Sequence, residues 1–229
     1  MIPSHARAIA VALLIAAVAA ACGSAARGTV RTSPQSVTVS QSDLAAIAKA
    51  RADSARYPYT AADVHFMSGM IGHHAQAIVM ARWAPTHGAS ASVRTLCERI
   101  INAQQDEIVT MQTWLRDRRQ PVPEARAGPM KMQMGAMEHE MLMPGMLTDE
   151  QMKQLDQARG PEFDRLFLTF MIQHHRGAVE MVKTLFGTNG AAQDELVFKF
   201  ASDVNVDQTT EIARMQRMLV AFAIEGHAP

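Results

Sequence analysis

The sequence predicts an all-α protein, an antiparallel four-helix bundle built from two repeated helical hairpins. Long stretches place apolar residues three and four positions apart, which is the period of an amphipathic helix. The segment MIGHHAQAIVMA at 70–81 returns as MIQHHRGAVEMV at 171–182, which indicates an internal repeat. Signals for β structure are scarce, and Asn189-Gly190 joins two helical patterns, so we expect almost no strand.

The N-terminus predicts export. A basic residue at position 7 is followed by an apolar run of 13 residues from Ile9 to Ala21, and then by Cys22. Such a run is too short to span a bilayer and is typical of a secretory signal peptide. Alanines precede Cys22 as in a bacterial lipoprotein signal, so we expect residues 1–21 to be removed and Cys22 to carry a lipid anchor in the membrane. A larger aliphatic residue is usual at Ala19, and ordinary signal-peptide cleavage nearby is the alternative.

Charge and cysteine content exclude several classes. Lys and Arg total 22, as do Asp and Glu, so loss of the signal peptide leaves a net charge near −1. No stretch forms a basic stripe, and nucleic acid is not an expected partner. Beyond Cys22 only Cys97 remains, which excludes a disulfide between two body cysteines and fits a small buried hydrophobe.

Capping signals and prolines divide the chain into elements. Residues 22–42 are rich in Ser, Thr and Gly and predict a flexible tether, and residues 43–224 form the four-helix domain, with a first short helix at about 43–56. Thr60 and Asp63 predict the start of a helix that runs to about residue 83, and a second follows from about 90 to 118. Prolines at 121, 123 and 129 end this hairpin.

The second half follows the same plan. Thr148 and Gln151 predict a capping box, a long helix follows Gly160-Pro161 and closes at Gly187, and a last helix is expected at 191–223. The repeated positions of the first helices keep an offset of 101: Asp63/Asp164, Phe66/Phe167, Met70/Met171, Ile71/Ile172, His73/His174, His74/His175, Ala77/Ala178 and Met80/Met181. Two hairpins with one apolar face each are expected to bury these faces against one another.

The repeated helices carry candidate metal ligands. These are Met67, Met70, His73, His74 and Met80 in the first half and Met171, His174, His175 and Met181 in the second. Imidazole suits Cu(II), Zn(II) or Ni(II), whereas thioether selects the soft ion Cu(I). Because adjacent helical residues point about 100° apart, we do not expect one ion to take both histidines of a pair.

Two interpretations of these helix motifs stay open. Met and His at core spacing also occur as packing, and a duplicated motif recurs by descent. The partner helices place Gln104 with Glu107 and Gln208 with Glu211, at an offset of 104. These side chains either orient the histidine rings or form solvated helix faces.

The segment between the two halves is exceptionally rich in methionine. MKMQMGAMEHEMLMPGM holds seven of them in 17 residues, where the composition of the chain predicts about 1.3, and the candidate ligands are Met130, Met132, Met134, Met137, His139, Met141, Met143 and Met146. Thioethers hold a soft monovalent ion without having to lose a proton. A Met-rich amphipathic stretch that covers the bundle or docks a partner is the alternative.

Catalytic motifs are absent from the sequence. It contains no Glu-x-x-His, His-Glu-x-x-His or Gly-x-Ser-x-Gly motif and no phosphate-binding loop. We therefore expect a protein that is not an enzyme.

Three stretches resemble one known family. DVHFMSGMIGHHAQAIVMA, PGMLTDEQMKQLDQARGPEFDRLFLTFMIQHHRGAVEMV and the Q..EI..M helices, spread over about residues 60–223, are similar to the domain-of-unknown-function family 305. The resemblance implies a ferritin-like, exported, copper-binding protein, since some members are periplasmic copper proteins implicated in copper resistance. The residues it carries over are Met70, His73, His74, Met171, His174 and His175. His65 and the connector methionines lie outside it.

Together these observations predict a copper-binding protein that buffers or sequesters Cu(I), with Ag(I) or Cu(II) as further ions, in the bacterial envelope and so contributes to metal tolerance. A copper-transfer protein or a second copy of the chain is the expected partner. The alternative is a helical envelope lipoprotein without metal, whose Met-rich segment docks a protein. A redox or copper-transfer enzyme component is a third class.

Overall fold

The computed structural model describes residues 40–42, 44, 45, 48, 49, 59–134 and 137–225. The expected signal peptide, Cys22 and nearly all of the tether lie outside the described residues. Of the helix expected at 43–56, residues 44, 45, 48 and 49 are described, and they are helical. The chain divides into two compact units, residues 1–40 and 41–229, and every element below belongs to the second.

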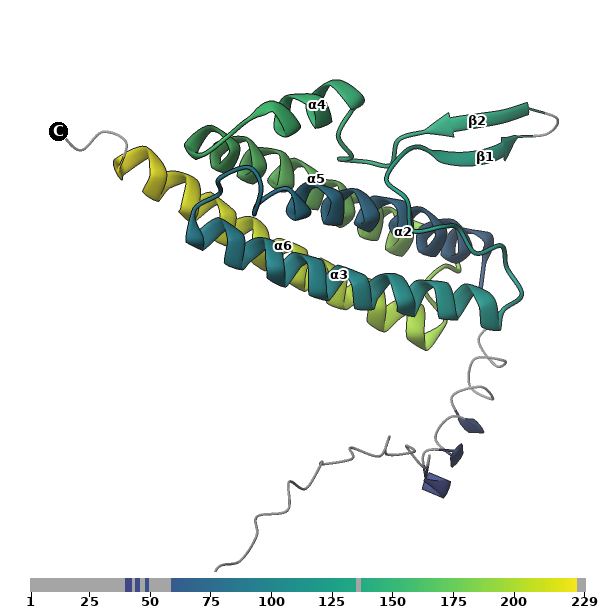
Figure 1. Cartoon of the computed structure of the whole chain (residues 1–229). Helices are drawn as coiled ribbons and strands as arrows, with labels where there is room; N and C mark the ends of the chain where they lie inside the picture. The colour runs from purple at the N-terminus through teal and green to yellow at the C-terminus, as the bar shows by residue number, and fades with distance from the viewer. Residues whose placement is uncertain (1–39, 43, 46–47, 50–58, 135–136, 226–229) are drawn as a thin grey trace, which may run out of the picture. The chain divides into compact units, whose positions relative to one another are not determined.

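Four long helices lie side by side and form two hairpins, which confirms the predicted all-α class (Figure 1). The first hairpin pairs α2 (Ala61–Arg82) with α3 (Ala91–Asp117), and the second pairs α5 (Pro161–Gly187) with α6 (Glu195–Glu225). A short helix, α4 (Asp149–Gln157), precedes α5.

The predicted helix starts are correct except at α6. Thr60 and Asp63 form a reciprocal capping box at α2, and Thr148 and Gln151 form another at α4. Helix α6 begins four residues later than predicted. Ala192 has a positive φ of 55°, and the Asp194 carboxylate accepts hydrogen bonds from the amides of the first helical residues. This turn is incompatible with a helix that begins at 191.

Two repeated aspartates tie the hairpins together. Asp63, at the start of α2, accepts a hydrogen bond of 2.7 Å from the amide of Ala192 in the α5–α6 connection. Its repeat mate Asp164, at the start of α5, accepts bonds of 3.1 and 3.2 Å from the amide of Ser90, the N-cap of α3. Each helix therefore begins beside the connection of the other hairpin, so α2 and α5 run antiparallel.

The Met-rich connector contains a β-hairpin, and the expectation of almost no strand was wrong here. Strands β1 (Met130–Met134) and β2 (Met137–Met141) pair antiparallel, with Met132 opposite His139 and Met134 opposite Met137. The M-x-M spacing of both runs is also the two-residue period of a strand. In the sequence, the two runs are separated by two residues of which the first is glycine, and such a spacing is a signal for a hairpin.

Past the hairpin, the connector is fixed across α2 and α5. The side chain of Gln76 holds both backbone groups of Leu147, donating to its carbonyl at 2.9 Å and accepting from its amide at 2.7 Å. At Gly177 a Cβ atom would lie 1.9 Å from the carbonyl oxygen of Pro144, so glycine is needed for this close approach. The connector leaves the hairpin at the α2–α5 side of the bundle.

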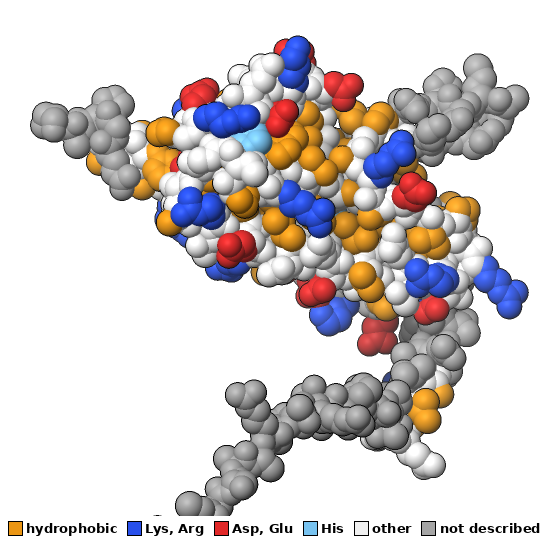
Figure 2. All heavy atoms as spheres, viewed as in Figure 1, with side chains coloured by type: hydrophobic (Ala, Val, Ile, Leu, Met, Phe, Trp, Pro, Cys, Tyr) orange, Lys and Arg blue, Asp and Glu red, His pale blue; other side chains and the backbone are white. Residues whose placement is uncertain are grey.

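The core has two apolar clusters, one around Phe66, Trp114 and Phe200 and the other around Leu96, Phe163 and Phe167. None of the described helices combines the length and apolarity that a membrane span requires. On the face seen in Figure 2, acidic and basic side chains are interspersed and apolar side chains gather between them, so this face shows no basic stripe.

Candidate metal centre

The four predicted histidines come together at mid-length of α2 and α5, between the two core clusters. All four side chains are fully buried. The rings of His73 and His174 face each other across the two helices, with centroids 3.8 Å apart. Within each helix the rings are farther apart: the centroids of His73 and His74 are separated by 6.2 Å, and those of His174 and His175 by 6.3 Å. The repeat thus produces one row in the order His74, His73, His174, His175.

A carboxylate closes each end of this row. His74 Nε2 lies 2.6 Å from Glu107 of α3, and His175 Nε2 lies 2.7 Å from Glu211 of α6. An ionised carboxylate only accepts hydrogen bonds, so each Nε2 donates, and Nδ1 is the nitrogen left without a hydrogen-bond partner. Metal-binding histidines commonly use this arrangement, in which the second nitrogen is held by a carboxylate or a carbonyl.

The connector holds the third ring. His73 Nε2 lies 3.0 Å from the carbonyl oxygen of Pro144. A carbonyl accepts, so here too Nε2 donates and Nδ1 carries a free lone pair. His174, the repeat mate of His73, has no hydrogen-bond partner at either ring nitrogen among the described residues. The connector therefore removes the symmetry that the repeat would otherwise impose.

Burial keeps the two central rings neutral. It lowers the pKa of His73 to about 3, with the neighbouring histidines adding to the effect, and the bond to Pro144 opposes it. Burial, followed by the charges of His73 and His175, also holds the pKa of His174 well below its usual value. A metal ion binds neutral imidazole, so these rings are in the binding form over the whole physiological pH range.

The α3–α6 side of the row is acidic. Burial raises the pKa of the Asp207 carboxyl, and the nearby charges of Glu107 and Glu211 raise it further. Gln104 and Gln208 are buried, but neither bonds a histidine, and Gln104 has no side-chain partner among the described residues. Of the four partner-helix residues weighed in the sequence, the glutamates orient the rings and the glutamines do not.

The predicted methionines differ in how deeply they are buried. Those of the helices are buried, with exposures of 0 % for Met67, Met70, Met80 and Met171 and 6 % for Met181. In the connector, Met143 and Met146 are buried in the bundle, which is the covering role weighed as an alternative, whereas Met141 is 49 % exposed. Side chains of the others between 131 and 140, His139 included, are outside the description, and Met130 is partly buried.

No three His, Cys, Asp or Glu side chains of the described residues group as a metal site requires. Sequence reasoning did not find the Pro144 carbonyl as a partner of His73. This contact depends on how the connector crosses α5, which local sequence patterns do not describe. The Pro144-Gly145 pair, a signal for a turn, was the local hint.

Comparison with known proteins identifies the family. Residues 63–219 match the model of the domain of unknown function DUF305. No curated protein is similar enough to the chain to be matched. A solved DUF305 protein from Streptomyces coelicolor has 29 % identity and a TM-score of 0.58, and covers 71 % of this chain and 94 % of its own. A DUF305 fragment from Deinococcus radiodurans has 28 % identity and a TM-score of 0.58, with 72 % and 99 % covered.

The protein CopM is also similar, and its solved structures contain copper or silver. Its Cu(I)-bound form has 28 % identity and a TM-score of 0.53, and covers 72 % of this chain and 99 % of its own. Its Cu(II)-bound form has 28 % identity and a TM-score of 0.54, with 70 % and 97 % covered. The repeated sequence, the helical fold and the family match together show that this chain belongs to the DUF305 family.

Proposed function

We propose that this protein binds copper, principally as Cu(I), and buffers or sequesters it in the bacterial envelope. The observation that carries the proposal is the row of buried histidines. Their four Nδ1 atoms have no hydrogen-bond partner among the described residues, and His174 has none at Nε2 either. A buried polar group without a partner costs about 1–3 kcal/mol, and a metal ion bound by these nitrogens would offset that cost.

Copper suits these ligands better than zinc does. The imidazoles lie on helices that also carry buried thioethers, and thioether sulfur selects the soft ion Cu(I) over Zn(II). Met67, Met70 and Met171 are fully buried on these helices, and we infer that methionine completes the coordination. Met70 and Met171, one turn before His74 and His175, are the first candidates.

Two further observations support this function. CopM, which is similar over most of its length, has been solved with Cu(I), Cu(II) and silver. The signal-peptide pattern before Cys22 supports export, and the similar Streptomyces coelicolor protein is described as a candidate secreted protein. We propose lipid attachment at Cys22 and a non-enzymatic role, with a copper-transfer protein as partner.

Metal competition tests the proposal. The purified protein is dialysed against Cu(I) under reducing conditions, with and without a tenfold excess of Zn(II), and bound metal is measured. We expect copper to be retained in both cases. Preferential retention of zinc would mean that methionine is not a ligand of the metal. Binding of neither metal would favour the alternative, a helical module whose Met-rich segment docks a protein.

Acid separates the two ligand types. Histidine sites lose copper when their imidazoles protonate, whereas thioethers carry no proton that competes with the ion. As the pH is lowered, we expect one Cu(I) fraction to be lost when His73, His74, His174 and His175 protonate, and a second fraction, which depends on the connector methionines, to remain bound at lower pH. Because burial lowers the pKa of His73 to about 3, the break for the buried row lies well below pH 6.5. A single population, lost in one step and indifferent to the connector, would mean that the connector methionines are not ligands.

A further inference from the structure

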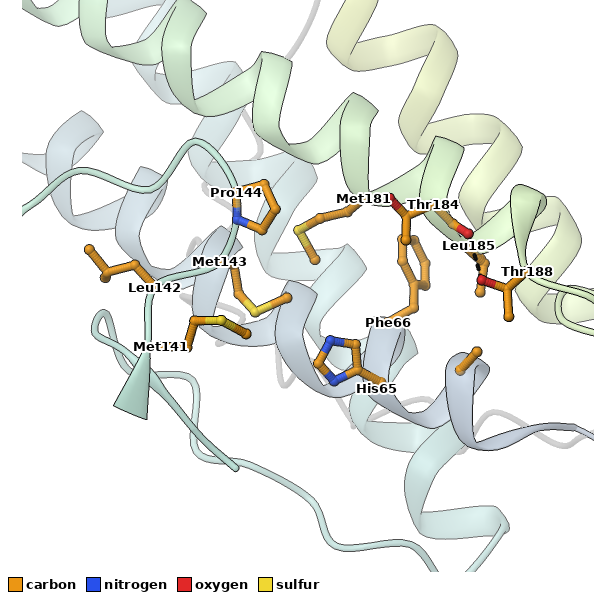
Figure 3. A pocket seen from close by; sticks show the side chains of 11 residues that line it. His65, Phe66, Met141, Leu142, Met143, Pro144, Met181, Thr184, Leu185 and Thr188 are labelled. Atoms are coloured by element: carbon orange, nitrogen blue, oxygen red, sulfur yellow. Dashed lines mark hydrogen bonds between the residues drawn. The ribbon is translucent and has the colours of Figure 1, made fainter. Parts of the chain in front are cut away.

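A second group of soft ligands lies at the surface, apart from the histidine row. It surrounds a cleft of about 360 Å³ between α2, α5 and the end of the β-hairpin. His65 of α2 and the connector residues Met141 and Met143 line it, with Met181 of α5 on the other wall. Figure 3 shows the imidazole of His65 and the thioethers of Met141 and Met143 facing this space.

Behind Met143, the backbone of α2 leaves room for sulfur at Gly69, which lines another cavity together with Met130 and not the cleft itself. Gly69 lies four residues after His65, so the two share one face of the helix. At Gly69 a Cβ atom would lie 3.2 Å from Sδ of Met143, 2.6 Å from its methyl carbon and 3.4 Å from Sδ of Met130. Two thioethers thus converge on a position of this face that has no side chain, one turn from an imidazole.

These residues are exposed to different degrees, as an exchange site requires. Met143 and Met181 are 5 % and 6 % exposed and form the floor, whereas Met141 is 49 % exposed and stands at the rim. His65 is half-buried, and no hydrogen bond to another described residue fixes its ring. An ion held here stays accessible to a second ligand-bearing molecule, while the histidine row is not.

We propose that His65, Met141 and Met143 form a surface site for a soft monovalent ion, Cu(I) or Ag(I), with Met130 and Met181 as flanking sulfur ligands. The site deepens the proposed function and rests on it, because it supplies the position at which copper is first acquired. Pro144, which follows Met143, accepts the hydrogen bond from His73. The cleft and the buried row therefore share a wall.

The test uses the whole chain with 13C-labelled methionine methyl groups and Ag(I) alone as the probe. We expect the methyl resonances of Met141 and Met143 to shift with the first equivalents of Ag(I). His65→Ala is expected to raise the dissociation constant read from these resonances at least tenfold. Gly69→Ala, which displaces Met143, is expected to weaken the same site with no ligand removed. Met218→Leu on α6, outside the cleft, is the matched control and should change nothing.

Each other result is decisive. If Ag(I) shifts only methionines of the helical core, the surface site is wrong and the proposed function stands. If Met141 and Met143 respond but His65→Ala leaves the dissociation constant unchanged, the assignment of His65 is wrong. If neither Ag(I) nor Cu(I) binds anywhere, the proposed function fails together with the site.

Discussion

His74 and His175 are each oriented by one carboxylate from the partner helix. Glu107 and Glu211 are 18 % and 19 % exposed, so these contacts lie at the boundary between the core and solvent. They bind each ring through Nε2 and leave Nδ1 as the nitrogen without a hydrogen-bond partner. The chemistry of the centre therefore depends on two residues that are not expected to touch the metal.

Replacing both glutamates tests this orienting role. In the double variant Glu107→Gln, Glu211→Gln, we expect copper affinity to fall about 10- to 100-fold, which is typical for loss of the group that orients a ligand. Competition with a Cu(I) chelator measures this change. Glu98→Gln, an exposed position of the same helix α3, is the matched control. Equal affinities in all three proteins would mean that the glutamates only pack against the rings.

The central histidines predict how stability depends on pH in the metal-free protein. The pKa of His73 is lowered to about 3, so between that value and 6.5 the unfolded state binds a proton that the folded state does not. Stability is then greatest above pH 6.5 and falls as the pH decreases. From pH 7.5 to pH 5 His73 is expected to reduce the free energy of unfolding by about 2 kcal/mol, and His174 acts in the same direction.

Urea denaturation at the two pH values measures this. In His73→Gln, about one proton fewer should be taken up on unfolding, so the free energy of unfolding should depend less steeply on pH. If the free energy of unfolding of the unmodified protein is the same at pH 5 and pH 7.5, the rings are not buried as described.

Single residues also show how far the sequence could predict the centre. Helical spacing and the repeat placed the four histidines at equivalent positions of two helices, and the structure brings them together. The bonds of His73 to Pro144 and of His74 to Glu107 join residues 71 and 33 positions apart. The first depends on the path of the connector, which periodicity does not describe.

Among the elements, the connector depends most on a single glycine. Gly177→Ala would put a methyl group 1.9 Å from the Pro144 carbonyl. We expect the connector to move off α5, His73 to lose its acceptor and the free energy of unfolding to fall by about 1–3 kcal/mol, as for other overpacked sites. Gly187→Ala at the end of the same helix meets no atom within 4 Å and is the control. Thermal unfolding of both variants compares them, and equal melting temperatures would contradict the close contact.

The β-hairpin shows where prediction from the sequence failed. Methionine is not among the residues enriched in strands, and its density suggested ligands before it suggested secondary structure. The M-x-M alternation and the Gly135-Ala136 link were the available signals. The helix starts were predictable where the capping signal is local, as at Thr60. The predicted start of α6 was wrong because the turn at Ala192 delays the helix by four residues.

For the whole molecule, the repeat provides the two hairpins and the aspartates join them. Asp164 is 4 % exposed, and both of its oxygens accept bonds from Ser90 of the other hairpin. Asp164→Ala leaves that amide without its partner and is expected to cost about 1–3 kcal/mol. Glu162→Ala, which removes an exposed ion pair with Arg165, is expected to cost less than about 1 kcal/mol. Chemical denaturation of both variants tests this, and similar losses would mean that the tie does not hold the hairpins together.

The central claim is that one protein binds Cu(I) through thioether and imidazole together. X-ray absorption spectroscopy of the Cu(I)-loaded protein tests this most directly, because it distinguishes sulfur from nitrogen neighbours of the metal. We expect a first coordination shell that contains both sulfur and nitrogen, with nitrogen lost when the four core histidines and His65 are replaced. A shell of nitrogen and oxygen alone, unchanged when the connector methionines are replaced by leucine, would contradict the account.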